Sequence, residues 1–145
     1  MAPTSLPTYK FYRITIPYHD GPRGIWCMRK FSYIGGNPPY NGSDISYYRA
    51  SFSASTHATA VNGGYTANQR FCSAEGEKFP QWTQVEFDEP ETISAYRLYS
   101  DELPLGFYPT AWTLSGSNDG STFVLIDTQS GISWSNGESK VFQVS

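Results

Sequence analysis

The chain has 145 residues, and its 10 Lys and Arg against 13 Asp and Glu give a formal net charge of −3. This balance argues against a nucleic acid partner, since nucleic-acid-binding proteins usually carry a concentrated basic face. The length suits one domain with a sizeable core, so residues 1–145 are expected to form a single domain.

Short segments rich in aromatic and β-branched residues run along the chain, with Gly and Pro between them. This pattern is typical of an all-β protein, an antiparallel β-sandwich. Residues 43–61 contain neither Gly nor Pro, and we expect a strand followed by a short helical turn there. Trp82 and Trp112 lie on expected strands and are assigned to the core. The expected strands are 9–16, 25–34, 82–87, 93–100, 111–117, 122–127 and 140–144.

Three long polar connections separate these strands, at residues 17–24, 62–70 and 101–109. Each contains at least one aromatic residue. Long ordered loops on a rigid scaffold are frequent positions for binding residues, so these three are the candidate binding loops.

The start of the chain, MAPTSLPTYK, has neither the basic nor the apolar region of a Sec signal peptide. No apolar run approaches the length of a membrane span. We therefore expect no Sec-dependent secretion and no membrane insertion. Cys27 and Cys72 are too few for a disulfide scaffold, and this favours two buried free thiols over one bridge.

The stretch WTLSGSNDGSTFVLID (112–127) joins two apolar runs through Asn118, Asp119 and Gly120. Asn-Asp-Gly between alternating strands predicts a β-hairpin. A calcium loop would need oxygen ligands at late positions, where Leu125 and Ile126 stand. We therefore expect a structural turn that holds neither a metal nor another ligand.

Catalytic motifs are not evident. His19 and His57 are the two histidines, and neither lies in a nucleophile motif. The sequence has no H-E-x-x-H, no Cys-x-x-Cys and no phosphate-binding glycine loop. The chain is therefore not expected to be an enzyme, and a small hydrolase is the weakest of the functional hypotheses.

Several segments together resemble the discoidin domain, also called the coagulation factor 5/8 type C domain. They also resemble its sugar-binding relatives, the family 32 carbohydrate-binding modules. PTAWTLSGSNDGSTFVLID (109–127) is similar to the family's Gly-Ser-Asn-Asp-Gly hairpin. PQWTQVEFDEPETISAYRLYS (80–100) and, less closely, ATAVNGGYTANQRFCS (58–73) resemble two further family segments. The resemblance implies a discoidin-like jelly roll.

The order of the segments differs from the family's. Residues 9–34 resemble the family's C-terminal strands, although here they come first. We interpret this as a circular permutation, in which residues 35–43 form a Gly- and Pro-containing linker and residues 44–144 are the remainder. This interpretation predicts that strand 9–16 pairs with or lies beside strand 140–144, with Tyr9 close to Val144.

The family often holds a structural calcium ion, and two departures from the family pattern disfavour that ion here. Asn62 stands where the family has an aspartate, and Lys30 stands where it has a glutamate. Calcium is bound by hard oxygen donors that usually include carboxylates. No metal and no other cofactor is therefore expected.

The resemblance implies a non-catalytic, lectin-like module that binds a carbohydrate or a cell-surface polysaccharide through the three candidate loops. Because no secretion signal is visible, we expect a phage virion component, namely a decoration, baseplate or tail-fibre protein assembled in the host cytoplasm. The alternative is a purely structural virion subunit that docks on other virion proteins without binding sugar. The expected ligand-binding residues are Tyr18, His19, Arg23, Tyr65, Asn68, Arg70, Phe107 and Tyr108.

Overall fold

A computed structural model shows a strand-rich fold and describes residues 6–19, 21, 24–35, 45, 50–55, 71–74, 78–100, 102 and 105–144. No helix in these ranges is long and apolar enough to cross a membrane. The elements are β1 (Thr8–Ile16), β2 (Cys27–Met28), β3 (Lys30–Gly35), β4 (Ser51–Ala54), β5 (Phe71–Cys72), β6 (Gln81–Tyr99), the 3-10 helix η3 (Leu105–Phe107), β7 (Trp112–Ser117), β8 (Val124–Gln129) and β9 (Ser139–Gln143).

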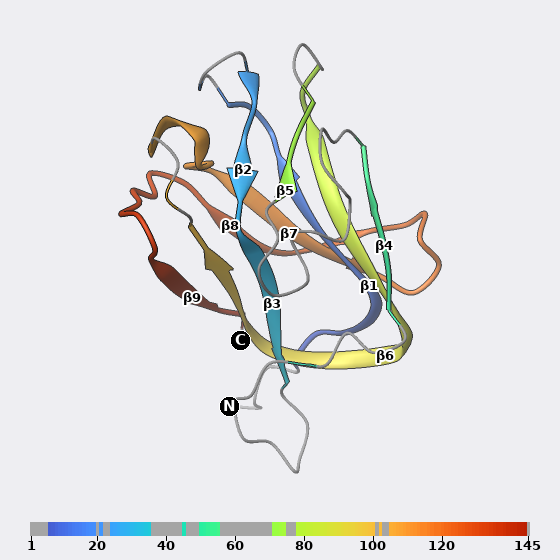
Figure 1. Cartoon of the computed structure of the whole chain (residues 1–145). Helices are drawn as coiled ribbons and strands as arrows, with labels where there is room; N and C mark the ends of the chain where they lie inside the picture. Colours follow the sequence, from blue (N-terminus) through green and yellow to red (C-terminus); the bar gives the residue numbers. More distant parts are fainter. Residues whose placement is uncertain are drawn as a thin grey trace.

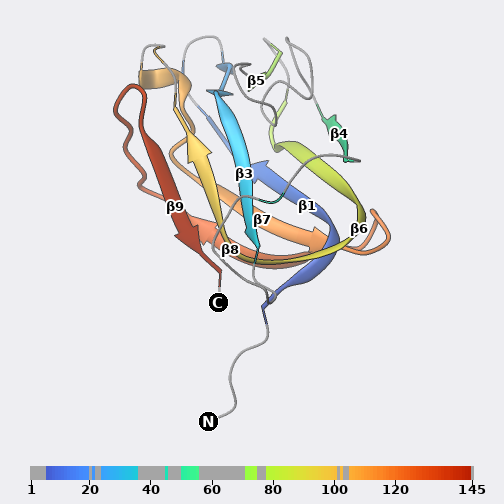
Figure 2. The same cartoon turned by 60° about the horizontal axis from the view of Figure 1, so that its bottom comes forward.

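Two antiparallel layers face each other across the core (Figures 1 and 2). One layer has the order β4-β6-β1-β7-β8 and uses mainly the first half of β6. The other layer contains β3 and β9, which both pair with the second half of β6. The short β2-β5 ribbon lies at one end. The expected all-β, antiparallel sandwich is confirmed.

Strand β6 joins the two layers, because one strand of 19 residues replaces the two predicted at 82–87 and 93–100. Its middle, Asp88–Pro90, is exposed, and the pairing register with β1 shifts once across this point, between Glu86 and Glu91. Proline has no N–H to donate to a partner strand, so local pairing is weakened where the strand turns between layers.

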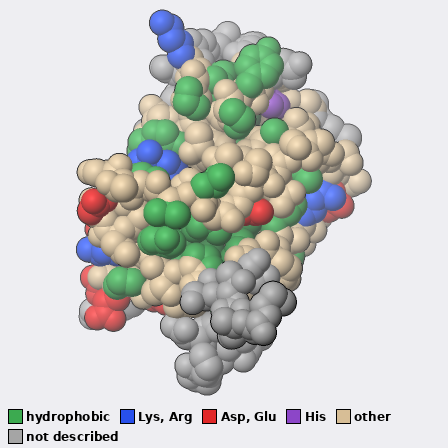
Figure 3. Space-filling view, turned by 180° about the vertical axis from the view of Figure 1, so that it is seen from behind, with side chains coloured by type: hydrophobic (Ala, Val, Ile, Leu, Met, Phe, Trp, Pro, Cys, Tyr) green, Lys and Arg blue, Asp and Glu red, His purple; other side chains and the backbone are tan. Residues whose placement is uncertain are grey.

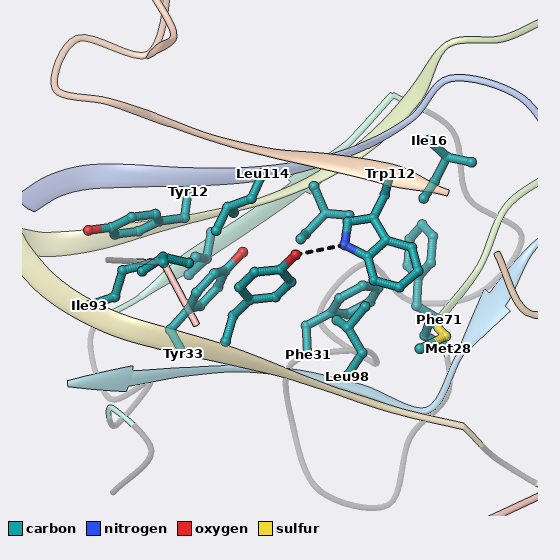
Figure 4. Close-up of a cluster of buried hydrophobic side chains, with 14 of the residues drawn as sticks. Tyr12, Ile16, Met28, Phe31, Tyr33, Phe71, Ile93, Leu98, Trp112 and Leu114 are labelled. Atoms are coloured by element: carbon teal, nitrogen blue, oxygen red, sulfur yellow. Dashed lines mark hydrogen bonds between the residues drawn. The ribbon is translucent and has the colours of Figure 1, made fainter. Parts of the chain in front are cut away.

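Aromatic rings fill the space between the layers (Figure 4). Tyr12 of β1 lies 5.2 Å from Tyr33 of β3, measured between ring centroids. The indole N–H of Trp112 donates a 2.9 Å hydrogen bond to the Tyr96 hydroxyl, which donates at 2.6 Å to the Asp127 carboxylate. Burial, and then the hydrogen bond to Asp127, raise the pKa of Tyr96. The assignment of Trp112 to the core is confirmed, since its side chain is fully buried.

The two ends of the described chain meet on β6. The N–H of Ile93 donates to the Pro7 carbonyl, and the N–H of Val144 donates to the neighbouring Ser94 carbonyl. Tyr9 and Val144 also line the same shallow groove. The two strands do not pair directly, because β1 pairs with β6 and β7 whereas β9 pairs with the far half of β6. The predicted closeness of Tyr9 and Val144 is confirmed.

The hairpin between β7 and β8 is confirmed. The Asp119 carboxylate accepts hydrogen bonds of 2.8 Å from the backbone N–H groups of Ser121 and Thr122, and one of 2.9 Å from the Ser117 hydroxyl. These bonds lower the pKa of Asp119. Gly120 has a φ of 76°, the left-handed conformation that an Asn-Asp-Gly turn requires. The polar side chains of this cluster thus form hydrogen bonds within the turn.

Candidate functional site

Two of the three candidate loops meet at one end of the sandwich, beside β2 and β5 (Figure 1). A Cβ atom added to Gly21 would overlap the Gly106 carbonyl oxygen and the ring of His19. Only glycine therefore lets the first loop lie against η3 of the third loop. The spatial convergence of residues 17–24 and 101–109, which are far apart in sequence, is a tertiary feature.

Tyr18 is the most exposed aromatic residue in this part of the described structure, with 68% of its surface accessible. Its ring lies 5.7 Å from that of Phe79, centroid to centroid, at an angle of 57°. The half-buried Phe79 therefore supports Tyr18 from one side and leaves most of the Tyr18 surface open to solvent. A supported, open ring is suited to contact the apolar face of a ligand.

Two of the expected ligand-binding side chains are turned into the protein. His19 is 7% exposed and Tyr108 is 1% exposed, and the ring of Tyr108 packs 6.3 Å from that of Trp134. These residues position the loops and do not present their rings to solvent. Phe107, on η3, is half-buried. Arg23, Tyr65, Asn68 and Arg70 lie outside the described residues.

A disulfide ties this end together, and the expectation of two free thiols was wrong. Cys27 of β2 and Cys72 of β5 lie directly opposite each other in the antiparallel ribbon, and a disulfide bond joins their sulfur atoms. Cross-strand pairing brings the cysteines together although 45 residues separate them in sequence. Cys72 lies two residues after residue 70, where the second candidate loop ends.

Trp26 anchors the same ribbon to the core. Its backbone N–H donates to the Ser73 hydroxyl at 3.0 Å, and its indole N–H donates to the Gln81 side chain at 2.9 Å. Its ring packs 5.0 Å from that of Phe71. The scaffold beneath the candidate loops is thus rigidly held by a disulfide, buried hydrogen bonds and aromatic contacts.

Lys30 does not fit a calcium site. It stands where the resemblance places a carboxylate, and its ammonium lies 5.5 Å from the centroid of the Tyr99 ring. A cation at this position repels a metal ion, and the donor set loses a hard oxygen ligand. Asn62, the other substituted position, lies outside the described residues, so the absence of calcium stays a prediction.

A second group of polar and aromatic residues was missed by the sequence reasoning. Arg13 of β1 lies with its guanidinium carbon 3.9 Å from the centroid of the Trp82 ring and 4.0 Å from that of Phe123. Trp82 is half-buried on the outer side of the sheet, so its assignment to the core was wrong. The buried residues Thr83, Val85 and Phe87 of β6 alternate with Trp82 and face inward instead.

Comparison with known proteins gives one match. The family model described as the F5/8 type C domain matches residues 42–144, which is well over half of the chain. No curated protein and no solved structure was found to match. The match begins after β1, β2 and β3, although these strands are built into the same sandwich.

Proposed function

We propose a function on the basis that the chain belongs to the F5/8 type C domain family. Members of this family are generally non-catalytic modules that bind carbohydrates or other surface molecules. The proposal is that this chain binds a glycan at the loop end of the sandwich. The observation that carries this proposal is the exposed Tyr18 ring, supported by Phe79 beside the junction of the first and third loops. The expected ligand is a cell-surface polysaccharide.

The chemistry of sugars explains why such a ring matters. One face of a pyranose ring is formed by C–H groups, and removing it from water against an aromatic ring is favourable. Covering roughly 50 Å² of apolar surface contributes about 1.3 kcal/mol, close to tenfold in affinity. Because one such contact is weak, several copies of the domain would be needed for firm attachment.

The test is binding of a multivalent form of the protein to a glycan array. Tyr18→Ala should lower binding about tenfold and leave the melting temperature nearly unchanged, since the ring is exposed. Leu125→Ala is the matched control, because Leu125 is a similarly exposed side chain, at 62%, on β8. Arg70→Ala tests the second loop.

The outcomes separate the alternatives. Loss of binding in the Tyr18 and Arg70 variants, with retention in the Leu125 variant, supports the loop site. Binding that survives both loop changes moves the site elsewhere on the molecule. If the wild-type protein binds no glycan at all, the structural role described below is favoured.

We place the protein on a phage virion as part of the same proposal. Disulfides persist on virion and cell surfaces but are rare in the reducing cytosol. The Cys27–Cys72 bridge therefore fits a protein that functions on an extracellular particle, with oxidation following release from the host. Purification of native particles, followed by mass spectrometry of their components, tests this location.

The second candidate function is docking to another protein subunit of the same particle, without sugar binding. A shallow groove of about 310 Å³ runs beside β8 and is lined by Leu6, Tyr9, Val124, Leu125 and other residues. Val124 and Leu125 are 49% and 62% exposed. If docking is the function, Leu125→Asp should release the protein from particles, whereas Tyr18→Ala should not.

We also propose that the domain is circularly permuted. The family match spans 42–144, yet β1 lies in the middle of the five-stranded layer and β3 lies in the opposite layer. A rearranged chain that begins at residue 44 and joins residue 144 to residue 6 through a short linker should therefore fold. An unfolded product would argue against the permutation, provided that the original order folds under the same conditions.

A further inference from the structure

The outer face of the five-stranded layer carries a group of contacting side chains around Arg13. Along β1 the buried Tyr12, Ile14 and Ile16 point inward, so Arg13 and Thr15 point outward. Figure 3, which views the molecule from behind, shows polar and hydrophobic side chains across this side, with most charged ones near the margins.

Arg13 lies between two aromatic side chains. Trp82 comes from β6, on one side of β1, and Phe123 leads into β8, on the other side, beyond β7. The guanidinium carbon is 3.9 Å from one ring centroid and 4.0 Å from the other. Contacts this short with two rings fix the position of the guanidinium plane.

Gln84 fixes the orientation of the Arg13 guanidinium within its plane. Its side-chain oxygen accepts a 2.9 Å hydrogen bond from Arg13 Nε, and its side-chain nitrogen donates to the Ser53 hydroxyl at 3.4 Å. Gln84 is itself 8% exposed, so it is held by its surroundings. Arg13 is thereby fixed at Nε, and its two Nη groups form the edge left for another partner.

The positive charge of Arg13 has no carboxylate partner among the described residues. Glu86, which lies two residues from Gln84 on β6, forms an ion pair of 3.3 Å with Lys10. Arg13 is half-buried, and the loss of hydration on partial burial lowers its pKa. A half-buried cation without a counter-charge favours the binding of an anion.

Hydroxyl side chains lie on the same outer face as Arg13. Arg13 lies opposite Ser115, and Thr15 lies opposite Thr113, in the β1-β7 pairing. All three hydroxyl residues alternate with buried positions and are half-buried. Within the described part of the chain, none of the three hydroxyls has a hydrogen-bond partner. The face thus combines one planar cationic fork with several groups that can bond to sugar hydroxyls.

We propose that Arg13, with Gln84, Thr15, Thr113 and Ser115 around it, forms a second binding site for a polysaccharide that contains uronic acid. A carboxylate is planar and carries a single negative charge. It meets both Nη groups in the plane of the fork, while the hydroxyls of the pyranose ring reach the Thr and Ser side chains. This site does not depend on glycan binding at the loops.

Affinity electrophoresis in gels that contain polygalacturonate tests the proposal. The wild-type protein should be retarded, and gels with the methyl-esterified polymer should not retard it. Arg13→Gln should weaken retardation by about tenfold or more, because it removes a charged, bidentate contact. Arg13→Lys keeps the charge but loses the fork, so it should also weaken binding.

Two controls make the result specific. Lys140→Gln removes one positive charge beside Trp134 and Glu138, and it should leave retardation unchanged. Val141→Ala shortens an exposed apolar side chain on β9, in the other layer, and should also leave it unchanged. Equal retardation of the wild type and of Arg13→Gln would overturn the proposal. So would a weakening by Lys140→Gln as large as that by Arg13→Gln, or retardation of the wild type by dextran sulfate as strong as that by polygalacturonate. If Arg13→Gln does not fold, the retardation of Arg13→Lys is compared with that of the wild type instead. Equal retardation of these two proteins would then overturn the proposal.

Discussion

Reduction of the Cys27–Cys72 disulfide is expected to lower the free energy of unfolding by about 4 kcal/mol at 25 °C. The bridge joins residues 45 apart, and the loop-closure relation gives roughly 13 cal/mol/K for the entropy that a loop of that length removes from the unfolded chain. For a domain of this size, the corresponding decrease in melting temperature is roughly 10–15 °C.

The assay is urea unfolding followed by tryptophan fluorescence, with and without a phosphine reductant. The reductant should move the midpoint to lower urea in the wild-type protein. It should have no effect on the Cys27→Ala/Cys72→Ala double variant, which controls for other actions of the reductant. Alkylation of the denatured, unreduced wild type should modify neither cysteine.

Two outcomes would refute this reasoning. If both cysteines of the unreduced protein are alkylated in denaturant, the bridge is absent. If the bridge is present but reduction leaves the unfolding midpoint unchanged, the bridge does not constrain the unfolded chain as the loop length implies. A matching loss of glycan binding after reduction would further show that the bridge holds the second candidate loop in place.

Four further outcomes are expected. Tyr96→Phe should cost about 1–3 kcal/mol in urea unfolding, because it leaves the buried indole N–H of Trp112 without an acceptor. The Tyr96→Phe/Trp112→Phe double variant should lose less stability than the sum of the two single losses. Gly120→Ala should cost about 1–2 kcal/mol in the same assay, since φ is 76° and the new Cβ would crowd Phe11. The folded-state pKa of Asp119 is depressed, so its contribution is present above the unfolded pKa of about 3.9 and is lost as pH falls through the folded value. Asp119→Asn should therefore reduce the fall in melting temperature at low pH. The same pH profile of the melting temperature in the variant and the wild type would contradict this. Millimolar calcium should not raise the melting temperature relative to a chelator, whereas a rise of several degrees would indicate a bound ion.

The sequence determined the features that depend on neighbouring residues. Alternation with period two, punctuated by Gly and Pro, predicts antiparallel strands, because adjacent side chains in a strand point to opposite faces. The hairpin at Asn118–Gly120 was predictable for the same local reason, since its turn needs residues that accept left-handed backbone. The family motifs lie in these same locally encoded segments, and the family match confirms them.

Only the tertiary structure decided features that depend on distant partners. The pairing of Cys27 with Cys72 follows from the β2-β5 register, which no local pattern specifies. The outward side of Trp82 follows from parity, because Val85 and Phe87 occupy the inward positions of β6, although a tryptophan on a strand suggested the core. The site around Arg13 draws on separate strands, and it exists because β1 lies between β6 and β7.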